Sequence, residues 1–246
     1  MAPEILALPD GRRIAFHRVA GALPGVVFLG GFRSDMTGTK AAFLDAWARA
    51  RGQAFLRLDY TGHGASSGDF RAGAIGDWAR DAHDAIAELT EGPQVLVGSS
   101  MGGWIALLLA RSIPGRIAGL VGIAAAPDFT EDGTWAEMDA AERARLRDEG
   151  EVLVPSEYGE EPYPITRRLI EDGRANLVLR DPLDLPFPVR LLHGSADRDV
   201  PLDVALRLLA HASAADMSLT IVKDADHRFS APENLELIAR TVEEVL

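Results

Sequence analysis

Hydrophobic residues in this chain form short runs, separated by longer stretches in which they recur every three or four positions. The runs have the length of strands buried on both faces of a sheet and cover residues 26–29, 54–58, 95–97, 120–124, 189–192 and 219–222. The stretches between them predict helices over residues 40–50, 77–89, 101–111, 202–209 and 235–246. This alternation predicts an α/β fold in which a mostly parallel, doubly wound sheet is covered by helices on both faces.

The first residues depart from this alternation. Residues 4–8 and 12–19 flank Pro9-Asp10-Gly11, whose residue types favour a tight turn. We expect an N-terminal antiparallel hairpin at the edge of the sheet.

Residues 127–188 also depart from it, because they are rich in Asp, Glu and Arg and contain several prolines together with Trp135, Tyr158 and Tyr163. An insertion after the strand that ends near residue 125 would cover the carboxyl ends of the strands, so we expect a lid or cap. An ordinary long crossover without substrate contact is the alternative. No segment has the composition of a linker between domains, so residues 1–246 are predicted to form a single domain.

Composition excludes several classes of partner. The formal net charge of -12 disfavours nucleic acid and anionic membrane surfaces. With no cysteine, disulfides, thiolate nucleophiles and cysteine-based metal sites are excluded. No targeting segment and no apolar run of about 20 residues is evident, so we expect a cytoplasmic protein without membrane insertion. The oligomeric state is not predicted.

The chemistry-bearing motif is the stretch 94–103, where an apolar strand runs into Gly98-Ser99-Ser100-Met101-Gly102 and then into a helical pattern. In a nucleophile elbow the turn is so tight that glycine is needed two positions before and two positions after the serine. Only Ser100 has glycines in this frame, which makes it the candidate nucleophile.

A serine hydroxyl needs a general base, and that base needs an orienting carboxylate. Asp197 follows a predicted strand by a few residues, and His227 follows the last one, so we assign them as carboxylate and base. Asp199 is the second choice for the carboxylate. His193 and His63 lie at strand ends or in glycine-rich turns and are expected to be structural.

The tetrahedral intermediate of acyl transfer needs two backbone donors for its oxyanion. One is expected from Met101, directly after the serine, and the second from Phe32, which follows Gly30-Gly31. This glycine pair lacks the Lys-Ser or Lys-Thr and the third glycine of nucleotide-binding loops. We therefore predict no nucleotide cofactor, and because the sequence has no obvious cluster of ligand residues, we predict no metal.

The elbow, the Ser-Asp-His order and the turn Asp59-x-x-Gly62-x-Gly64-x-Ser66 resemble the α/β-hydrolase fold superfamily over nearly the whole chain. The chain more closely resembles the acyl-protein thioesterases related to α/β-hydrolase domain-containing protein ten, through residues 28–32, 36–40, 92–104, 190–194 and 226–228. That resemblance implies a serine hydrolase that removes long acyl chains from cysteine thioesters and cleaves acyl glucuronides and other esters. It also marks Ser100, Asp197 and His227.

The leading hypothesis is a serine esterase or thioesterase that acts on a small-molecule ester or an acylated protein through an acyl-enzyme on Ser100. Carbon-carbon bond hydrolysis and perhydrolysis would use the same three residues, and they remain alternatives. A hydrolase-fold protein that binds a small apolar ligand without turnover is the alternative from another class.

Overall fold

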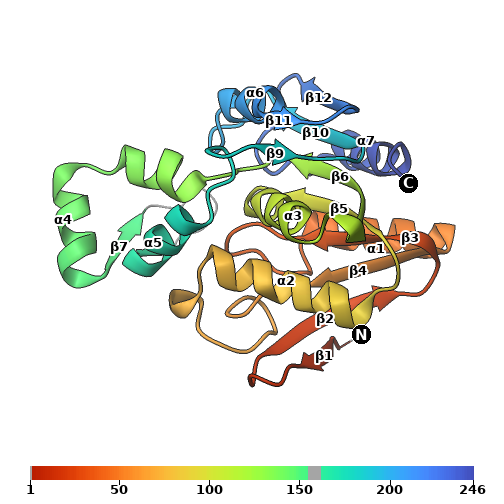
Figure 1. Ribbon diagram of the computed structural model, residues 1–246, viewed down its shortest axis with the longest axis horizontal. Helices are drawn as coiled ribbons and strands as arrows, with labels where there is room; N and C mark the ends of the chain where they lie inside the picture. The colour runs from red at the N-terminus through yellow and green to blue at the C-terminus, as the bar shows by residue number, and fades with distance from the viewer. Residues whose placement is uncertain (1, 155–161) are drawn as a thin grey trace.

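The computed structural model describes residues 2–154 and 162–246. Eight strands form one sheet in the order β1-β2-β4-β3-β5-β6-β10-β12 (Figure 1). Their bounds are β1 (Glu4–Ala7), β2 (Arg13–Val19), β3 (Ala22–Leu29), β4 (Gln53–Leu58), β5 (Gln94–Ser99), β6 (Ile117–Ile123), β10 (Val189–Gly194) and β12 (Met217–Val222). The pairs β1/β2 and β2/β4 are antiparallel and the remaining pairs are parallel, which confirms the predicted mostly parallel sheet with an N-terminal hairpin.

Five helices pack on the two faces of this sheet: α1 (Thr39–Arg51), α2 (Ile75–Leu89), α3 (Met101–Ser112), α6 (Leu202–His211) and α7 (Pro232–Glu243). Buried side chains of α1 and α7 share one hydrophobic cluster, and those of α2, α3 and α6 share the other. The apolar residues of the central strands divide between the two clusters because successive strand side chains point to opposite faces. This arrangement is the predicted doubly wound layering.

Several predicted bounds are wrong by two to four residues. The strand expected at residue 26 begins at Ala22, and the last helix begins at Pro232 instead of residue 235. Proline at the first position of a helix loses no intrahelical hydrogen bond, because that N–H has no partner in the helix. The spacing of apolar residues does not reveal a helix that begins at a proline.

Residues 127–188 contain the π-helical turn η3 (Thr130–Trp135), α4 (Ala140–Glu149), β7 (Glu151–Val154), β8 (Tyr163–Thr166), α5 (Arg167–Ala175) and β9 (Leu183–Asp184). The short strand β9 pairs with β11 (Ala212–Ser213), and β7 pairs with β8. Figure 1 shows α4, α5 and β7 in a lobe that projects from the side of the sheet. Tyr158, which the sequence analysis named, lies outside the described residues.

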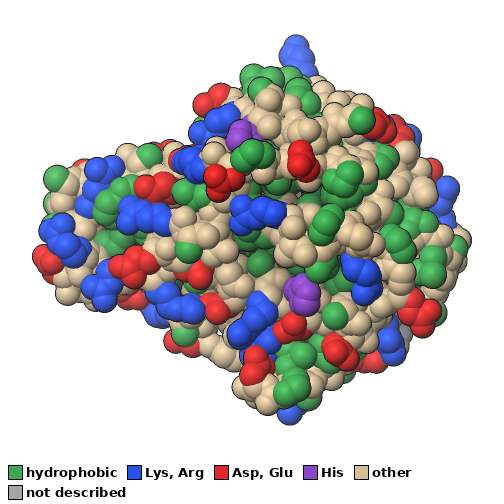
Figure 2. All heavy atoms as spheres, in the orientation of Figure 1, with side chains coloured by type: hydrophobic (Ala, Val, Ile, Leu, Met, Phe, Trp, Pro, Cys, Tyr) green, Lys and Arg blue, Asp and Glu red, His purple; other side chains and the backbone are tan. Residues whose placement is uncertain are grey.

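The lobe is joined to the rest of the molecule by contacts with α3 and also with α2, where the Gly76 N–H donates to Asp172. The indole N–H of Trp104 donates to the carbonyl oxygen of Asn176 at 3.1 Å, and the Arg111 guanidinium donates to that of Leu177. Figure 2 shows basic and acidic side chains interspersed over the lobe's surface. Among the described residues, no helix has the length and apolar character needed to cross a bilayer.

Candidate active site

Ser100 occupies the turn between β5 and α3, where its backbone adopts φ 54° and ψ -119°. Such a conformation is costly for a residue with a Cβ. A Cβ on Gly98 would lie 2.4 Å from the Gly102 carbonyl oxygen, and one on Gly102 would lie 2.1 Å from that of Leu29. Both contacts are far too short, so only glycine fits these two positions. The local sequence therefore explains the sharp turn that exposes Ser100 at the strand end.

The structure brings the three residues chosen from the sequence into hydrogen-bonding contact: Ser100, Asp197 and His227. The Ser100 hydroxyl is 3.1 Å from His227 Nε2, and His227 Nδ1 is 2.9 Å from Asp197 Oδ2. The register of the parallel strands explains the meeting, because Leu29 lies beside Gly98, and Gly194 beside Val222, at one edge of the sheet. Each of the three residues follows a strand that ends at that edge.

These contacts define a tautomer and a direction of proton movement. With Nδ1–H donating to Asp197, His227 Nε2 is left to accept from the Ser100 hydroxyl. Burial acts to raise the pKa of Asp197, but hydrogen bonds from His227 and from the Val200 N–H outweigh it, and the net shift is downward. Asp197 therefore stays ionised, and a carboxylate in this place would stabilise an imidazolium on His227.

The second-choice carboxylate and the other two histidines have different surroundings. The N–H of Asp199 donates to Asp197 Oδ1 at 3.0 Å, and the Asp199 side chain lines the cavity beside Ser100. His193 is buried, and its Nε2–H donates to the Val200 carbonyl oxygen at 2.9 Å. His63 is buried against the rings of Tyr60, Phe70 and Trp78, and burial lowers its pKa to about 4.

The two predicted oxyanion donors lie beside Ser100. Met101 is the first residue of α3, so its N–H belongs to the set that has no acceptor within the helix. Phe32 lines the same cavity, and the preceding Gly31 lies against Ser100, since a Cβ on it would be 3.4 Å from the Ser100 Cβ. An oxyanion on a carbonyl attacked by Ser100 would form in this region.

The cavity that contains Ser100 has a volume of about 470 Å³. Residues 127–188 contribute the apolar side chains Phe129, Val154, Tyr163 and Ile165 to its lining. The Phe32 ring packs edge-on against Phe129 and Tyr163, with centroids 5.8 and 6.1 Å apart, and so joins the two parts of the wall. An apolar cavity next to a nucleophile fits an acyl chain.

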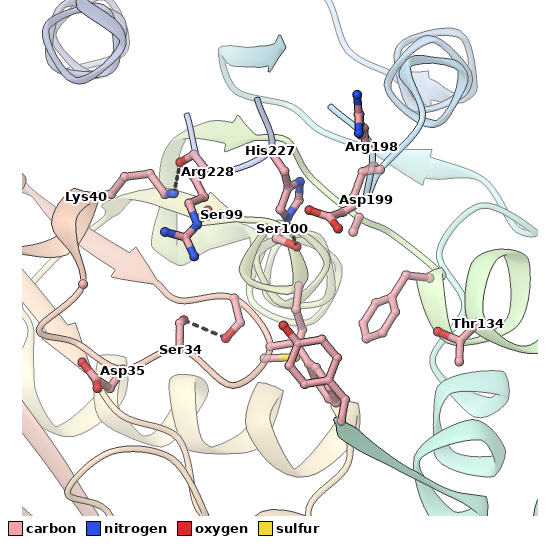
Figure 3. A pocket seen from close by; sticks show the side chains of 18 of the residues that line it. Ser34, Asp35, Lys40, Ser99, Ser100, Thr134, Arg198, Asp199, His227 and Arg228 are labelled. Carbon is pink, nitrogen blue, oxygen red and sulfur yellow. Dashed lines mark hydrogen bonds between the residues drawn. The ribbon is translucent and has the colours of Figure 1, made fainter. Parts of the chain in front are cut away.

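Sequence reasoning did not select several residues that line this cavity. Phe129, Val154 and Ile165 carry no local signal, because only the fold of residues 127–188 brings them to Ser100. Lys40 and Arg228 also line it and lie on one side of Ser100 and His227 (Figure 3). Lys40 is one of only two lysines among the 25 Lys and Arg residues, a signal that could have drawn attention to it.

One group of side chains in the described part of the chain has ligand atoms close enough together to hold a metal ion, within 4.8 Å of one another. It comprises Asp197, Asp199 and His227. A cation bound there would compete for Asp197 Oδ2 and His227 Nδ1, the two atoms that form the hydrogen bond between these residues. We assign no metal to them.

Comparison with known proteins gives the family. The Alpha/beta hydrolase family matches residues 26–240 of this chain. The chain belongs to that family.

Similar proteins indicate which members of this family the chain resembles. Bovine mitochondrial palmitoyl-protein thioesterase ABHD10 is 32% identical over 244 residues, which make up 99% of this chain and 79% of the bovine protein. The crystal structure of a putative hydrolase from Agrobacterium vitis S4 superposes with a TM-score of 0.94 at 42% identity, covering 100% of this chain and 99% of that one. Mouse α/β hydrolase domain-containing protein 10 superposes with a TM-score of 0.92 at 30% identity, covering 100% and 98%.

The protein is therefore an ABHD10-like α/β hydrolase and a hydrolase of ester or thioester bonds. The expectation of a cytoplasmic protein is contradicted, since the ABHD10 relatives from cattle, rat and human are named as mitochondrial. That expectation used the composition of the first residues and the absence of a long apolar run, and the names of the relatives overturn it.

Proposed function

We propose that this protein hydrolyses acyl thioesters and carboxylic esters through an acyl-enzyme on Ser100. The observation that carries the proposal is the 3.1 Å approach of the Ser100 hydroxyl to His227 Nε2, with Asp197 on the other ring nitrogen. Nucleophile, base and orienting carboxylate in this geometry are the requirements of acyl transfer.

In the first half-reaction, Ser100 Oγ attacks the carbonyl carbon while His227 Nε2 takes the hydroxyl proton. The N–H groups of Phe32 and Met101 stabilise the oxyanion. The carbon-sulfur or carbon-oxygen bond then breaks, and His227 returns the proton to the leaving thiolate or alkoxide. In the second half-reaction His227 deprotonates a water molecule that attacks the acyl-enzyme, the bond between the acyl carbon and Ser100 Oγ breaks, and His227 returns the proton to Oγ as the carboxylic acid leaves.

We assign the acyl chain to the apolar part of the cavity, under the cap that residues 127–188 form. Phe129, Val154, Tyr163 and Ile165 support this assignment, since they offer hydrocarbon surface next to Ser100. The relatives named palmitoyl-protein thioesterase support acylated substrates, either proteins or small molecules.

Covalent labelling tests the nucleophile directly. A fluorophosphonate probe is expected to label the wild-type protein at Ser100 alone, and Ser100→Ala should abolish labelling. The same variant should reduce kcat for an octanoyl thioester by about 10⁴-fold or more, because it removes the nucleophile. Ser99→Ala is the matched control, since it removes the adjacent hydroxyl and leaves the frame of Gly98 and Gly102 intact. Retained turnover in Ser100→Ala would refute the assignment, and binding of an apolar ligand without probe labelling would favour a non-catalytic protein.

A further inference from the structure

The cavity beside Ser100 has an apolar side and a side with two cationic side chains. Figure 3 shows Lys40 and Arg228 on one side of Ser100 and His227, and Thr134 of η3 on the other. The apolar side chains of residues 127–188 belong to the same part of the chain as Thr134. A scissile carbonyl at Ser100 would therefore have an apolar region on one side and two cationic side chains on the other.

Lys40 is fixed in this position by contact with the histidine loop. It is the second residue of α1, and its Nζ donates to the carbonyl oxygen of Arg228, 188 residues away and directly after His227. The pKa of Lys40 is lowered to about 8, chiefly by burial, with Asp226 acting to raise it and Arg228 to lower it. The fold thus keeps two like charges near each other, on the half-buried Lys40 and the exposed Arg228, an arrangement that an anion between them would stabilise.

The neighbouring carboxylates have local partners. Asp35 lines the cavity, but its Oδ1 accepts from the Thr37 N–H at 2.7 Å and from the Thr37 hydroxyl at 2.5 Å. Asp226 accepts from the Phe229 N–H at 3.0 Å. In a chain with a net charge of -12, an anionic substrate is repelled at long range and needs local cations to bind.

We propose that Lys40 and Arg228 form a leaving-group subsite that binds an anionic group, a carboxylate or a phosphate, on the thiol or alcohol that departs from the acyl-enzyme. The proposal rests on the function proposed above, because it requires the acyl chain to occupy the apolar side. Lysine and arginine bind both anions through charge-assisted hydrogen bonds.

The test compares thioesters that share one acyl group and differ in the charge of the leaving group. Octanoyl para-mercaptobenzoate is paired with octanoyl para-mercaptobenzamide, and octanoyl phosphopantetheine with octanoyl pantetheine. For each pair the readout is the ratio of kcat/KM for the anionic substrate to kcat/KM for the neutral one. Effects on Ser100 or His227 cancel in this ratio, so a merely structural role of Lys40 would not move it.

At pH 7 we expect Lys40→Met and Arg228→Met each to lower the ratio by about tenfold for at least one pair. Lys223→Met is the matched control, since it removes the other lysine, which is exposed and outside the cavity, and should leave the ratio at its wild-type value. A fall with the benzoate pair alone identifies a carboxylate as the ligand, and a fall with the pantetheine pair alone identifies a phosphate.

The pH dependence gives a second readout. Because kcat/KM reports the free enzyme, the wild-type ratio should fall as the pH rises through about 8, where Lys40 loses its proton. Lys40→Arg keeps the charge, and its ratio should stay constant over that range.

A ratio that is equal in wild type, Lys40→Met and Lys223→Met for both pairs would overturn the subsite while leaving the thioesterase function intact. Failure of the wild-type protein to hydrolyse the neutral thioesters would instead overturn the proposed function, and the subsite with it.

Discussion

At the scale of single residues, the backbone of Ser100 and the carboxylate of Asp197 set the geometry of the site. The strained turn at Ser100 places its hydroxyl 3.1 Å from His227 Nε2. The N–H groups of Asp199 and Val200 hold Asp197 Oδ1 at 3.0 and 2.9 Å, which leaves Oδ2 for His227. A carboxylate held at both oxygens fixes the direction of the imidazole ring.

Asp197→Asn should therefore lower kcat for an octanoyl thioester by about 10⁴-fold, because the amide no longer stabilises the required tautomer or the imidazolium. Asp199→Asn keeps its own N–H and should lower kcat by less than about tenfold. Steady-state kinetics on both purified variants would check this. Equal losses in the two variants would show that Asp199 shares the orienting role.

At this scale the sequence predicted Ser100 as the nucleophile and Asp197 as the carboxylate, with Asp199 as the second choice. Glycine spacing points to Ser100, since its steric requirement acts between residues two positions apart. The preference for Asp197 over Asp199 could be tested only by the folded loop after β10. The choice depends on which side chain points at His227, 30 residues further along the chain.

At the scale of elements, one side chain ties together the two ends of residues 127–188. Asp128 is fully buried and has φ 59°. Its carboxylate accepts from the N–H groups of Val178 at 2.8 Å and Leu179 at 3.0 Å, 50 residues or more away. Arg180 approaches the same carboxylate at 3.3 Å. The stretch between residues 128 and 178 therefore starts and ends at one closed junction.

Asp128→Ala should lower the free energy of unfolding by about 2–4 kcal/mol, because it leaves two buried N–H groups without an acceptor and puts a Cβ-only residue at positive φ. Urea denaturation followed by circular dichroism measures this loss. Asp128→Asn is the matched variant, since it keeps one acceptor oxygen and tolerates the left-handed backbone, and it should lose less. An Asp128→Ala variant as stable as wild type would contradict the role of the junction.

Most elements of the α/β body could be predicted from hydrophobic spacing, because central strands and their covering helices bury apolar residues at fixed periods. The start of α7 at Pro232 was missed, since a proline start contributes no apolar residue to the period. The short strands within residues 127–188 were missed as well. Each of them forms only by pairing with another short strand, β7 with β8 and β9 with β11, and segments of two to four residues carry little periodicity.

At the scale of the whole molecule, the fold holds a neutral histidine inside the core. His63 is 3% exposed, and burial lowers its pKa from 6.5 to about 4. The unfolded chain binds a proton at this residue below pH 6.5, whereas the folded protein does not until about pH 4. Unfolding therefore takes up a proton in that window, and stability is lost as the pH falls through it.

The contribution of His63 to the free energy of unfolding should decrease by about 3 kcal/mol between pH 6.5 and pH 4. His63→Phe does not titrate and retains a ring for the contacts with Phe70 and Trp78. Urea titrations of both proteins across this pH range should show the wild type losing stability faster than the variant on acidification. Parallel pH profiles of the two proteins would contradict a proton uptake at His63.

The sequence by itself determined that Ser100 stands in a nucleophile-elbow turn and how strands and helices alternate, because both depend on sterics and burial periods among near neighbours in the chain. Only the tertiary structure decided the meeting of Ser100 and His227 across 127 residues, the contact of Asp197 with His227, and the lining of the cavity by Phe129, Lys40 and Arg228. These depend on contacts between segments that are distant along the chain. Such contacts form only when the sheet brings the carboxyl ends of its parallel strands to one edge and residues 127–188 fold beside them.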